Sequence, residues 1–138
     1  MSLDTGHWIL PTNIQDIPLG TIGFVYVITN RLTNKKYIGK KLLENKKKRK
    51  PLKGRVNARR YKVESNWKEY TGSSPILNET IEKVGKDKFQ FNILSFHPSK
   101  LLLSYNETKT IIENNAIFSN EYYNEVCSLR VRNKKIHL

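Results

Sequence analysis

Two tyrosines eleven residues apart, Tyr26 and Tyr37, lie in short apolar segments next to the most basic part of the chain. Tyr26 belongs to the run FVYVI, and Tyr37 begins the run YIGKK. A phenol hydroxyl can orient a water molecule, or accept its proton when nearby positive charge lowers the phenol pKa. The alternative is that both residues are ordinary aromatic residues of β-strands. The charge around them and the elements that carry them bear on this choice.

The basic residues are concentrated in one region. The 138 residues include 25 Lys and Arg against 12 Asp and Glu, a formal net charge of +13. Residues 31–62 hold fifteen of the basic residues and one acid, Glu44. A polyanion would neutralise such a density of like charge, and its phosphates would release counterions on binding. The charge therefore predicts a nucleic-acid partner. An anionic membrane is the weaker alternative because no amphipathic helix accompanies the block, and KKKRK at 46–50 also suits a localisation signal.

The composition gives little support to other classes of protein. No apolar run is long enough to cross a bilayer, and the first ten residues, MSLDTGHWIL, lack the features of a signal peptide. The single cysteine, Cys127, has no internal partner for a disulfide, which fits a reducing compartment. The three histidines are scattered and form no zinc-binding pattern. We therefore expect a cytoplasmic protein with one domain and a modest hydrophobic core.

Local patterns place the two tyrosines on a β-hairpin. Residues 24–28 are β-branched or aromatic and predict a strand, residues 30–36 supply turn chemistry, and residues 36–39 predict a second strand. A turn centred on residues 33–34 gives the antiparallel pair an odd register sum. Tyr26 and Tyr37 then project from the same face, diagonal to each other, because their own sum is also odd.

The segments on either side of the hairpin are less regular. Residues 1–22 predict an N-terminal arm, with Trp8 and Ile9 as the residues that would pack it down. Residues 42–57 are polar and basic and predict a loop. Residues 58–70 predict a short helix, in which Trp67 and Tyr70 are expected to serve packing, with base stacking as a minor alternative.

The second half of the chain alternates helices with a strand. A helix is expected within 73–85, with Ser74 as N-cap, Pro75 in its first position and Gly85 as its end. Three further elements follow from periodicity: a strand at 89–96, a helix at 104–115 and a short extended segment within 121–133.

The order of these residues and elements resembles the GIY-YIG nuclease superfamily. The resemblance covers about residues 23–125 and rests on Tyr26, the eleven-residue spacing, Tyr37-Ile38-Gly39, Gly72-Ser73-Ser74, Gly85, the strand FQFNIL, a glutamate on the next helix and Tyr123-Asn124. It implies an α+β fold, a small domain with a three-stranded antiparallel sheet flanked by helices. Within this organisation, a basic insertion occupies about 42–70 and a basic tail occupies 126–138.

The resemblance also implies a reaction and a set of site residues. Proteins of this superfamily hydrolyse DNA phosphodiesters with a divalent metal ion, usually Mg²⁺, for which Mn²⁺ can substitute. Carried over to this sequence, the catalytic residues are Tyr26, Tyr37, Glu107 and Asn124, with Gly39 beside the site. Glu107 is the implied metal ligand, and Glu113 and Glu121 are its rivals. A lone glutamate suits Mg²⁺, which keeps most of its waters.

The chain departs from the pattern of the superfamily in two places. The glycine of the first half-motif lies one step early, at Gly23, and the catalytic arginine would fall on Lys47 by simple counting. Arg59 and Arg60 are the preferred replacements, with Arg49 and Arg55 as alternatives. The remaining cations are expected to contact the DNA backbone, which positions a protein without specifying sequence: Lys40, Lys41, Lys47, Arg49, Lys53 and Arg55.

The sequence therefore predicts a metal-dependent DNA endonuclease of homing or restriction type. Its alternative is a non-catalytic, basic nucleic-acid-binding module, and a ribosome-associated basic protein is a third option. A carboxylate among phosphates is not needed for binding alone, which favours the enzyme. The expected partner is double-stranded DNA rather than a membrane. A homodimer is a further option, because one site per chain would otherwise cut two strands in sequence.

Overall fold

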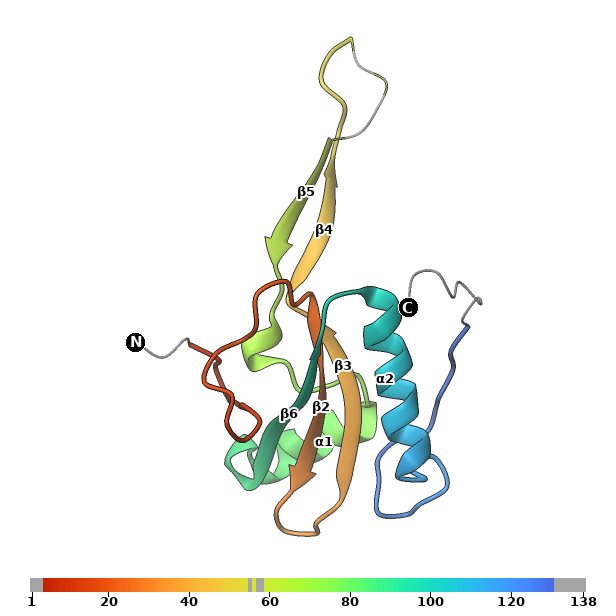
Figure 1. Cartoon of the computed structure of the whole chain (residues 1–138). Coiled ribbons are helices and arrows are strands. Elements are labelled where there is room, and N and C mark those ends of the chain that lie inside the picture. Colours follow the sequence, from red (N-terminus) through yellow and green to blue (C-terminus); the bar gives the residue numbers. More distant parts are fainter. Residues whose placement is uncertain (1–3, 55, 57–58, 131–138) are drawn as a thin grey trace.

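A computed structural model describes residues 4–54, 56 and 59–130, and its central element is a β-sheet with helices packed against it (Figure 1). The strand order is β1-β6-β2-β3, formed by β1 (Trp8–Ile9), β6 (Phe89–His97), β2 (Gly23–Asn30) and β3 (Lys36–Leu42). β2 pairs antiparallel with both β3 and β6, as expected. The α+β class is confirmed, but the sheet has four strands rather than three, because β1 pairs in parallel with β6.

The N-terminal arm thus contributes to the sheet. Its short strand β1 was missed because two residues carry no periodic pattern. Trp8 is buried in the core, as predicted, and its indole N–H donates to the carbonyl oxygen of Trp67. Ile9, the other residue expected to pack the arm down, is 48% exposed because β1 lies at the open edge beside β6.

Two helices cover opposite faces of the sheet. Alternation along β2 sends Phe24, Tyr26 and Ile28 into the cluster that includes Leu77 of α1 (Pro75–Val84). The intervening residues Val25 and Val27 pack in the cluster of Leu103 and Ile111, both on α2 (Lys100–Glu113). The apolar residues of each helix therefore lie on one side of it and pack against the shared sheet.

The predicted helix boundaries at α1 are confirmed. The hydroxyl of Ser74 accepts the N–H of Leu77, Pro75 begins the helix and Gly85 ends it with φ +98°. α2 begins four residues earlier than expected, because Ser99 caps it by accepting the N–H of Leu102. Two short 3₁₀ turns, Trp67–Glu69 and Lys86–Lys88, precede and follow α1.

The basic insertion differs from its prediction. Instead of a loop at 42–57 and a helix at 58–70, it forms a two-stranded antiparallel sheet of β4 (Glu44–Arg49) and β5 (Arg59–Glu64). Tyr61 and Val63 alternate with charged residues, a period of two that suits a strand, and pairing with β4 satisfies the backbone hydrogen bonds. This hairpin extends away from the body of the domain (Figure 1).

The prediction that Tyr26 and Tyr37 share a face is confirmed. Tyr26 pairs with Gly39 and Ile28 with Tyr37, an odd register that puts the two tyrosines in diagonal positions. Their ring centroids lie 6.3 Å apart. Because β3 is the last strand of the sheet on this side, the pair stands beside the edge of the sheet.

Candidate active site

Gly39 allows the Tyr26 side chain to reach the edge of the sheet. Tyr26 is 1% exposed and extends beneath β3, where a Cβ on Gly39 would overlap its hydroxyl and lie 2.5 Å from its Cζ. A Cβ on Gly72, just before α1, would lie 3.4 Å from the same hydroxyl and 3.1 Å from Cε2 of Tyr37. Two positions without side chains therefore let both phenols approach the start of α1.

A third tyrosine completes an aromatic cluster at this edge. The hydroxyl of Tyr37 lies 2.9 Å from Oγ of Ser73, the residue before the N-cap of α1. Half-buried Tyr70 has its ring centroid 6.3 Å from that of Tyr26. Burial and the neighbouring Tyr37 phenol raise the pKa of Tyr70, a hydrogen bond with Ser73 opposes this, and Glu107 adds to the rise.

Burial has a larger effect on the deepest of the three phenols. The pKa of Tyr26 is raised well above its usual value of 10.0, first by burial and then by Tyr37, Tyr70 and Glu107. Tyr26 is therefore a neutral phenol at physiological pH. As a neutral phenol it can donate a hydrogen bond, which suits it to hold an oxygen atom in place.

Glu107 reaches the same edge from the other face of the sheet. It lies on α2 and shares with Tyr37 the wall of a pocket of about 360 Å³, to which Lys40, Ser73, Asn124 and the exposed Glu125 also contribute. Its side chain is 21% exposed, and burial raises its pKa while Lys40 opposes the rise. The strand edge therefore brings together a phenol, a poorly solvated carboxylate and a cation.

Lys40 is the cation that the structure places in this pocket. Its Nζ donates to Oγ of Ser104 at 2.6 Å and lies 4.0 Å from Oε1 of Glu107. The preferred replacements for the catalytic arginine, Arg59 and Arg60, are exposed on β5 and do not line the pocket. They were expected on a helix at 58–70, whereas the structure places them on the extended hairpin.

The other predicted DNA contacts are divided between the site and the hairpin. Lys41 lies on β3 with its Nζ 4.1 Å from the centroid of the Tyr70 ring, a cation–π contact at the border of the site. Lys47 and Arg49 belong to β4, and Lys53 lies in the turn beyond it. Arg55 lies outside the described residues.

Asn124 supports the edge strand. Lys36 donates its N–H to the carbonyl oxygen of Glu121 at 2.9 Å and accepts the N–H of Tyr123 at 2.7 Å. Two residues further along β3, the Asn124 side chain binds both backbone groups of Ile38. Its Oδ1 accepts the N–H of Ile38 at 2.9 Å, and its Nδ2 donates to the carbonyl oxygen of Ile38 at 2.8 Å. Of the short extended segment predicted within 121–133, the described part forms one isolated parallel bridge, Tyr122 with Lys36, and residues 131–133 lie outside the described residues. The buried amide of Asn124 fixes β3 between Tyr37 and Gly39.

Replacing Asn124 with Ala is expected to cost about 2–4 kcal/mol of unfolding free energy, because it leaves a buried N–H and a buried carbonyl of Ile38 without partners. Urea denaturation followed by circular dichroism measures this. The control is Asn120→Ala in an exposed turn, expected within about 0.5 kcal/mol of the unmodified protein. Equal stability of the two variants would contradict the supporting role of Asn124.

The donor set fits a single hard divalent cation. Within the described ranges, no three His, Cys, Asp or Glu side chains gather as a ready-made cage. Mg²⁺ does not require one, because it retains several waters and binds through one or two carboxylates together with substrate phosphate. Burial raises the pKa of Glu107, and the ammonium of Lys40 lies 4.0 Å from its carboxylate, beyond hydrogen-bond distance. A divalent cation would therefore stabilise the charge of Glu107. Glu125 stands at the rim of the same pocket.

Sequence reasoning missed two members of the site. Tyr70 was expected to serve packing, although its place just before the Gly72-Ser73 turn was a usable signal. Lys40 was expected to contact the DNA backbone, although it directly follows Gly39 in the strand that carries Tyr37. Tyr70 required only the turn geometry to be placed, whereas the position of Lys40 depends on the contact of its ammonium with Ser104 on α2.

Comparison with protein families agrees with this arrangement. The family model described as "Putative endonuclease segE, GIY-YIG domain" matches residues 8–127, which includes β1 and the Asn124 segment. The chain belongs to this GIY-YIG endonuclease family. Comparison with curated proteins and with solved structures gave no significant match. In the part of the chain that the structure describes, no helix has both the length and the apolar character needed to cross a bilayer.

Proposed function

We propose that the chain is a DNA endonuclease that depends on a divalent metal ion and hydrolyses phosphodiester bonds at the β3 edge. The observation that carries the proposal is that Tyr37, Lys40 and Glu107 line one pocket. The two faces of the sheet supply different groups to it, the Tyr37 phenol from the α1 side and the Glu107 carboxylate from α2.

Each residue of the pocket has a distinct task in this proposal. Glu107 and, at the rim, Glu125 would hold Mg²⁺ or Mn²⁺, which when bound supplies a Lewis acid for the phosphate. Tyr37, whose hydroxyl lies 2.9 Å from Ser73 Oγ, orients the attacking water or accepts its proton. Lys40 stabilises the charge that develops on the phosphate, the role expected of an arginine.

The buried phenols have a positioning role. Tyr26 keeps its proton because burial raises its pKa, and it donates a hydrogen bond toward the reacting oxygens. Tyr70 stands between Lys41 and Tyr37 and keeps its proton for the same reason. Asn124 acts through the backbone of Ile38, which fixes the directions of Tyr37, directly before it, and of Lys40, two residues after it.

The proposed substrate is double-stranded DNA, and the enzyme would be of homing or restriction type. One pocket per chain implies either two successive nicks or a homodimer that cuts both strands. The order of appearance of products separates these two modes: open circles accumulate before linear plasmid when single chains act in turn, whereas a homodimer yields linear plasmid directly.

The function is tested by incubating purified protein with supercoiled plasmid in Mg²⁺, in Mn²⁺ and in EDTA. We expect open circles or linear plasmid with either metal ion and neither product with EDTA. Binding of plasmid without nicking in both metals would contradict the enzyme and support the alternative, a non-catalytic nucleic-acid-binding module.

The pH dependence of nicking gives a second test. Activity needs the ionised carboxylate of Glu107, so it is expected to fall as pH decreases through a pKa that burial has raised. Because Mg²⁺ competes with protons for the carboxylate, the acid limb should move to lower pH at higher Mg²⁺ concentration. Rates at two Mg²⁺ concentrations from about pH 4, near the usual glutamate pKa of about 4.3, to about pH 8 measure this shift. An acid limb unaffected by Mg²⁺ would contradict the assignment.

A further inference from the structure

The most exposed element of the molecule is the hairpin of β4 and β5, called here the basic ribbon. It stands away from the sheet and both helices (Figure 1). All six residues of β5 are exposed. A two-stranded hairpin without a packed face is at best marginally stable in water. Because the hairpin nevertheless keeps its strand pairing in the folded chain, we expect a partner that covers it.

The charge of the basic ribbon indicates the chemistry of that partner. Residues 45–63 contain no acid. The register places Lys46 opposite Lys62, and like charges directly opposite each other on a sheet are destabilising. The acids of the strands, Glu44 and Glu64, pair only at the base. A polyanion would relieve this repulsion along the whole length of the basic ribbon.

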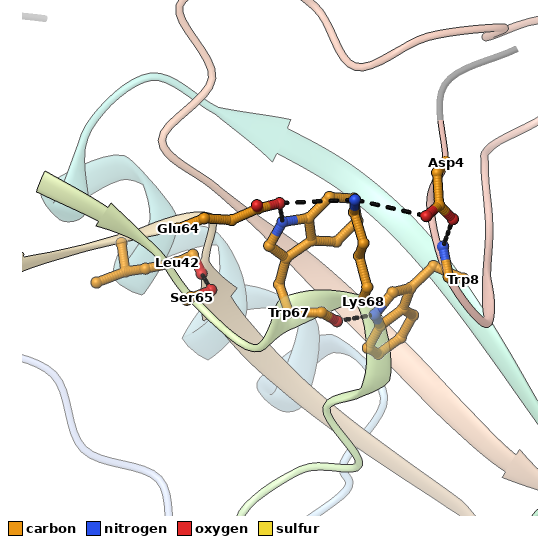
Figure 2. A network of polar contacts seen from close by, with 8 residues as sticks. Asp4, Trp8, Leu42, Glu64, Ser65, Trp67 and Lys68 are labelled. Atoms are coloured by element: carbon orange, nitrogen blue, oxygen red, sulfur yellow. Dashed lines mark hydrogen bonds and ion pairs between the residues drawn. The ribbon is translucent and has the colours of Figure 1, made fainter.

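Contacts at its base fix the basic ribbon to the domain (Figure 2). Ser65 donates its N–H to the carbonyl oxygen of Leu43 at 2.9 Å and its hydroxyl to that of Leu42. The indole N–H of Trp67, a residue only 4% exposed, donates to Oε1 of Glu64 at 3.1 Å. Lys68 lies 3.7 Å from the same oxygen. The buried tryptophan, more than the exposed ion pair, makes this base rigid.

The rigid base connects the basic ribbon to the active site through both of its strands. β4 follows directly from β3, which carries Tyr37 and Lys40. β5 returns through Trp67 to Tyr70. The orientation of the basic ribbon relative to the pocket is therefore set by covalent continuity and by the packing of Trp67.

A second cavity lies between the basic ribbon and the start of α2. It has a volume of about 610 Å³, and four lysines line it: Lys46, Lys47, Lys62 and Lys100. Lys100 and Glu107 are seven residues apart on α2, which is about 10 Å along the helix axis. In duplex DNA this corresponds to about three base pairs, at about 3.4 Å per base pair.

We propose that the basic ribbon is a recognition arm that lies in the major groove of DNA beside the cleaved bond, with the lysine-lined cavity against the adjacent backbone. The major groove of undeformed B-DNA admits a two-stranded β-ribbon, whereas binding in the minor groove, about 6 Å wide, generally comes with a kink in the duplex. Six residues per strand span about 20 Å, or about six base pairs. The contacts therefore begin about three base pairs from the cut and extend to one side of it. This inference rests on the proposed function for the position of the cut.

The test compares two variants with equal changes in charge. One carries Lys46→Gln, Lys47→Gln and Lys62→Gln in the basic ribbon. The control carries Lys83→Gln, Lys86→Gln and Lys88→Gln, which lie at and after the end of α1. Fluorescence anisotropy with a 30-base-pair DNA duplex, a length of about three helical turns, is measured at several salt concentrations. The slope of log K (the association constant) against log salt is negative. Its magnitude should decrease by about 2–3 in the first variant and by less than about 1 in the control.

The groove is tested with two modified duplexes. A bulky substituent on C5 of the cytosines blocks the major groove, and an RNA duplex has a major groove too narrow to enter. Each should weaken binding of the unmodified protein about tenfold or more, for loss of a comparable set of base contacts. Neither should weaken binding of the basic-ribbon variant further. Equal binding of the unmodified protein to all three duplexes, or equal salt slopes for the two variants, would overturn the proposal.

These outcomes are separate from those of the catalytic test. If the unmodified protein nicks plasmid and the basic-ribbon variant keeps its salt slope, the recognition arm is wrong while the endonuclease stands. If the basic-ribbon variant loses its salt slope and groove preference but the unmodified protein never nicks, the arm stands and the endonuclease fails.

Discussion

Replacing Glu107 with Gln is expected to lower the rate of plasmid nicking about a thousandfold or more. The substitution keeps the shape of the side chain and removes the charge at the wall of the 360 Å³ pocket. Loss of one charge-stabilising group at a reacting phosphate has an effect of about 10²–10³, and Glu107 would also hold the metal ion. Nicking rates at saturating DNA in Mg²⁺ measure the effect.

The matched control is Glu113→Gln, an exposed glutamate at the end of the same helix, which should nick at the unmodified rate. Binding of a DNA duplex by Glu107→Gln should be as tight as that of the unmodified protein, or tighter. Equal nicking rates for Glu107→Gln and Glu113→Gln would contradict the proposed role of the Glu107 carboxylate.

The stability of Glu107→Gln should show that its lost activity does not come from unfolding. Burial raises the pKa of Glu107 in the folded protein, so the ionised form is disfavoured there relative to the unfolded chain. The stability contributed by this group is therefore present at pH below its unfolded pKa and is lost as pH rises through the folded value. Without metal at pH 7, the neutral Gln variant should melt at the same temperature or a higher one, as measured by circular dichroism.

The parts of the site that were predictable from sequence are those fixed by local geometry. The parity of the hairpin depends only on turn length and strand alternation, so it placed Tyr26 and Tyr37 on one face correctly. Ser74, Pro75 and Gly85 defined α1 because capping is decided within a few residues. Glu107 came from the resemblance to the family, and α2 places it in the pocket with Tyr37.

The parts that sequence could not give depend on contacts between distant segments. A helix was expected at 58–70 because these residues were considered without their partner, and pairing with residues 44–49 decides for a strand instead. The same pairing places Arg59 and Arg60 on the exposed strand β5 rather than on a helix. Strand β1 exists only because β6 offers it an open edge. The position of the Lys40 ammonium in the pocket depends on the packing of α2 against β3, because this ammonium donates to Ser104 on α2.

Replacing Gly39 with Ala is expected to lower the nicking rate about a hundredfold and to cost about 1–3 kcal/mol of stability. A Cβ at this position would lie 2.5 Å from Cζ of Tyr26 and overlap its hydroxyl. The ring cannot move aside easily, because Trp8 packs against it with ring centroids 4.8 Å apart. Either the phenol or the β3 edge must shift, and each shift displaces a group of the site. Urea denaturation and plasmid nicking measure the two effects.

A double variant separates crowding from chemistry at this position. Adding Tyr26→Phe to Gly39→Ala removes the overlapping hydroxyl, so part of the lost stability should return, whereas the lost activity should not. As a control, Gly20→Ala has open space around its Cβ and φ +83°, so it should cost stability through the backbone alone and leave nicking unchanged. If Gly39→Ala instead matches the unmodified protein in both stability and rate, the Tyr26 phenol does not reach the reacting edge beneath residue 39. Tyr26 would then have no part in the proposed site, in which phenols from one face of the sheet and a carboxylate from the other meet at β3.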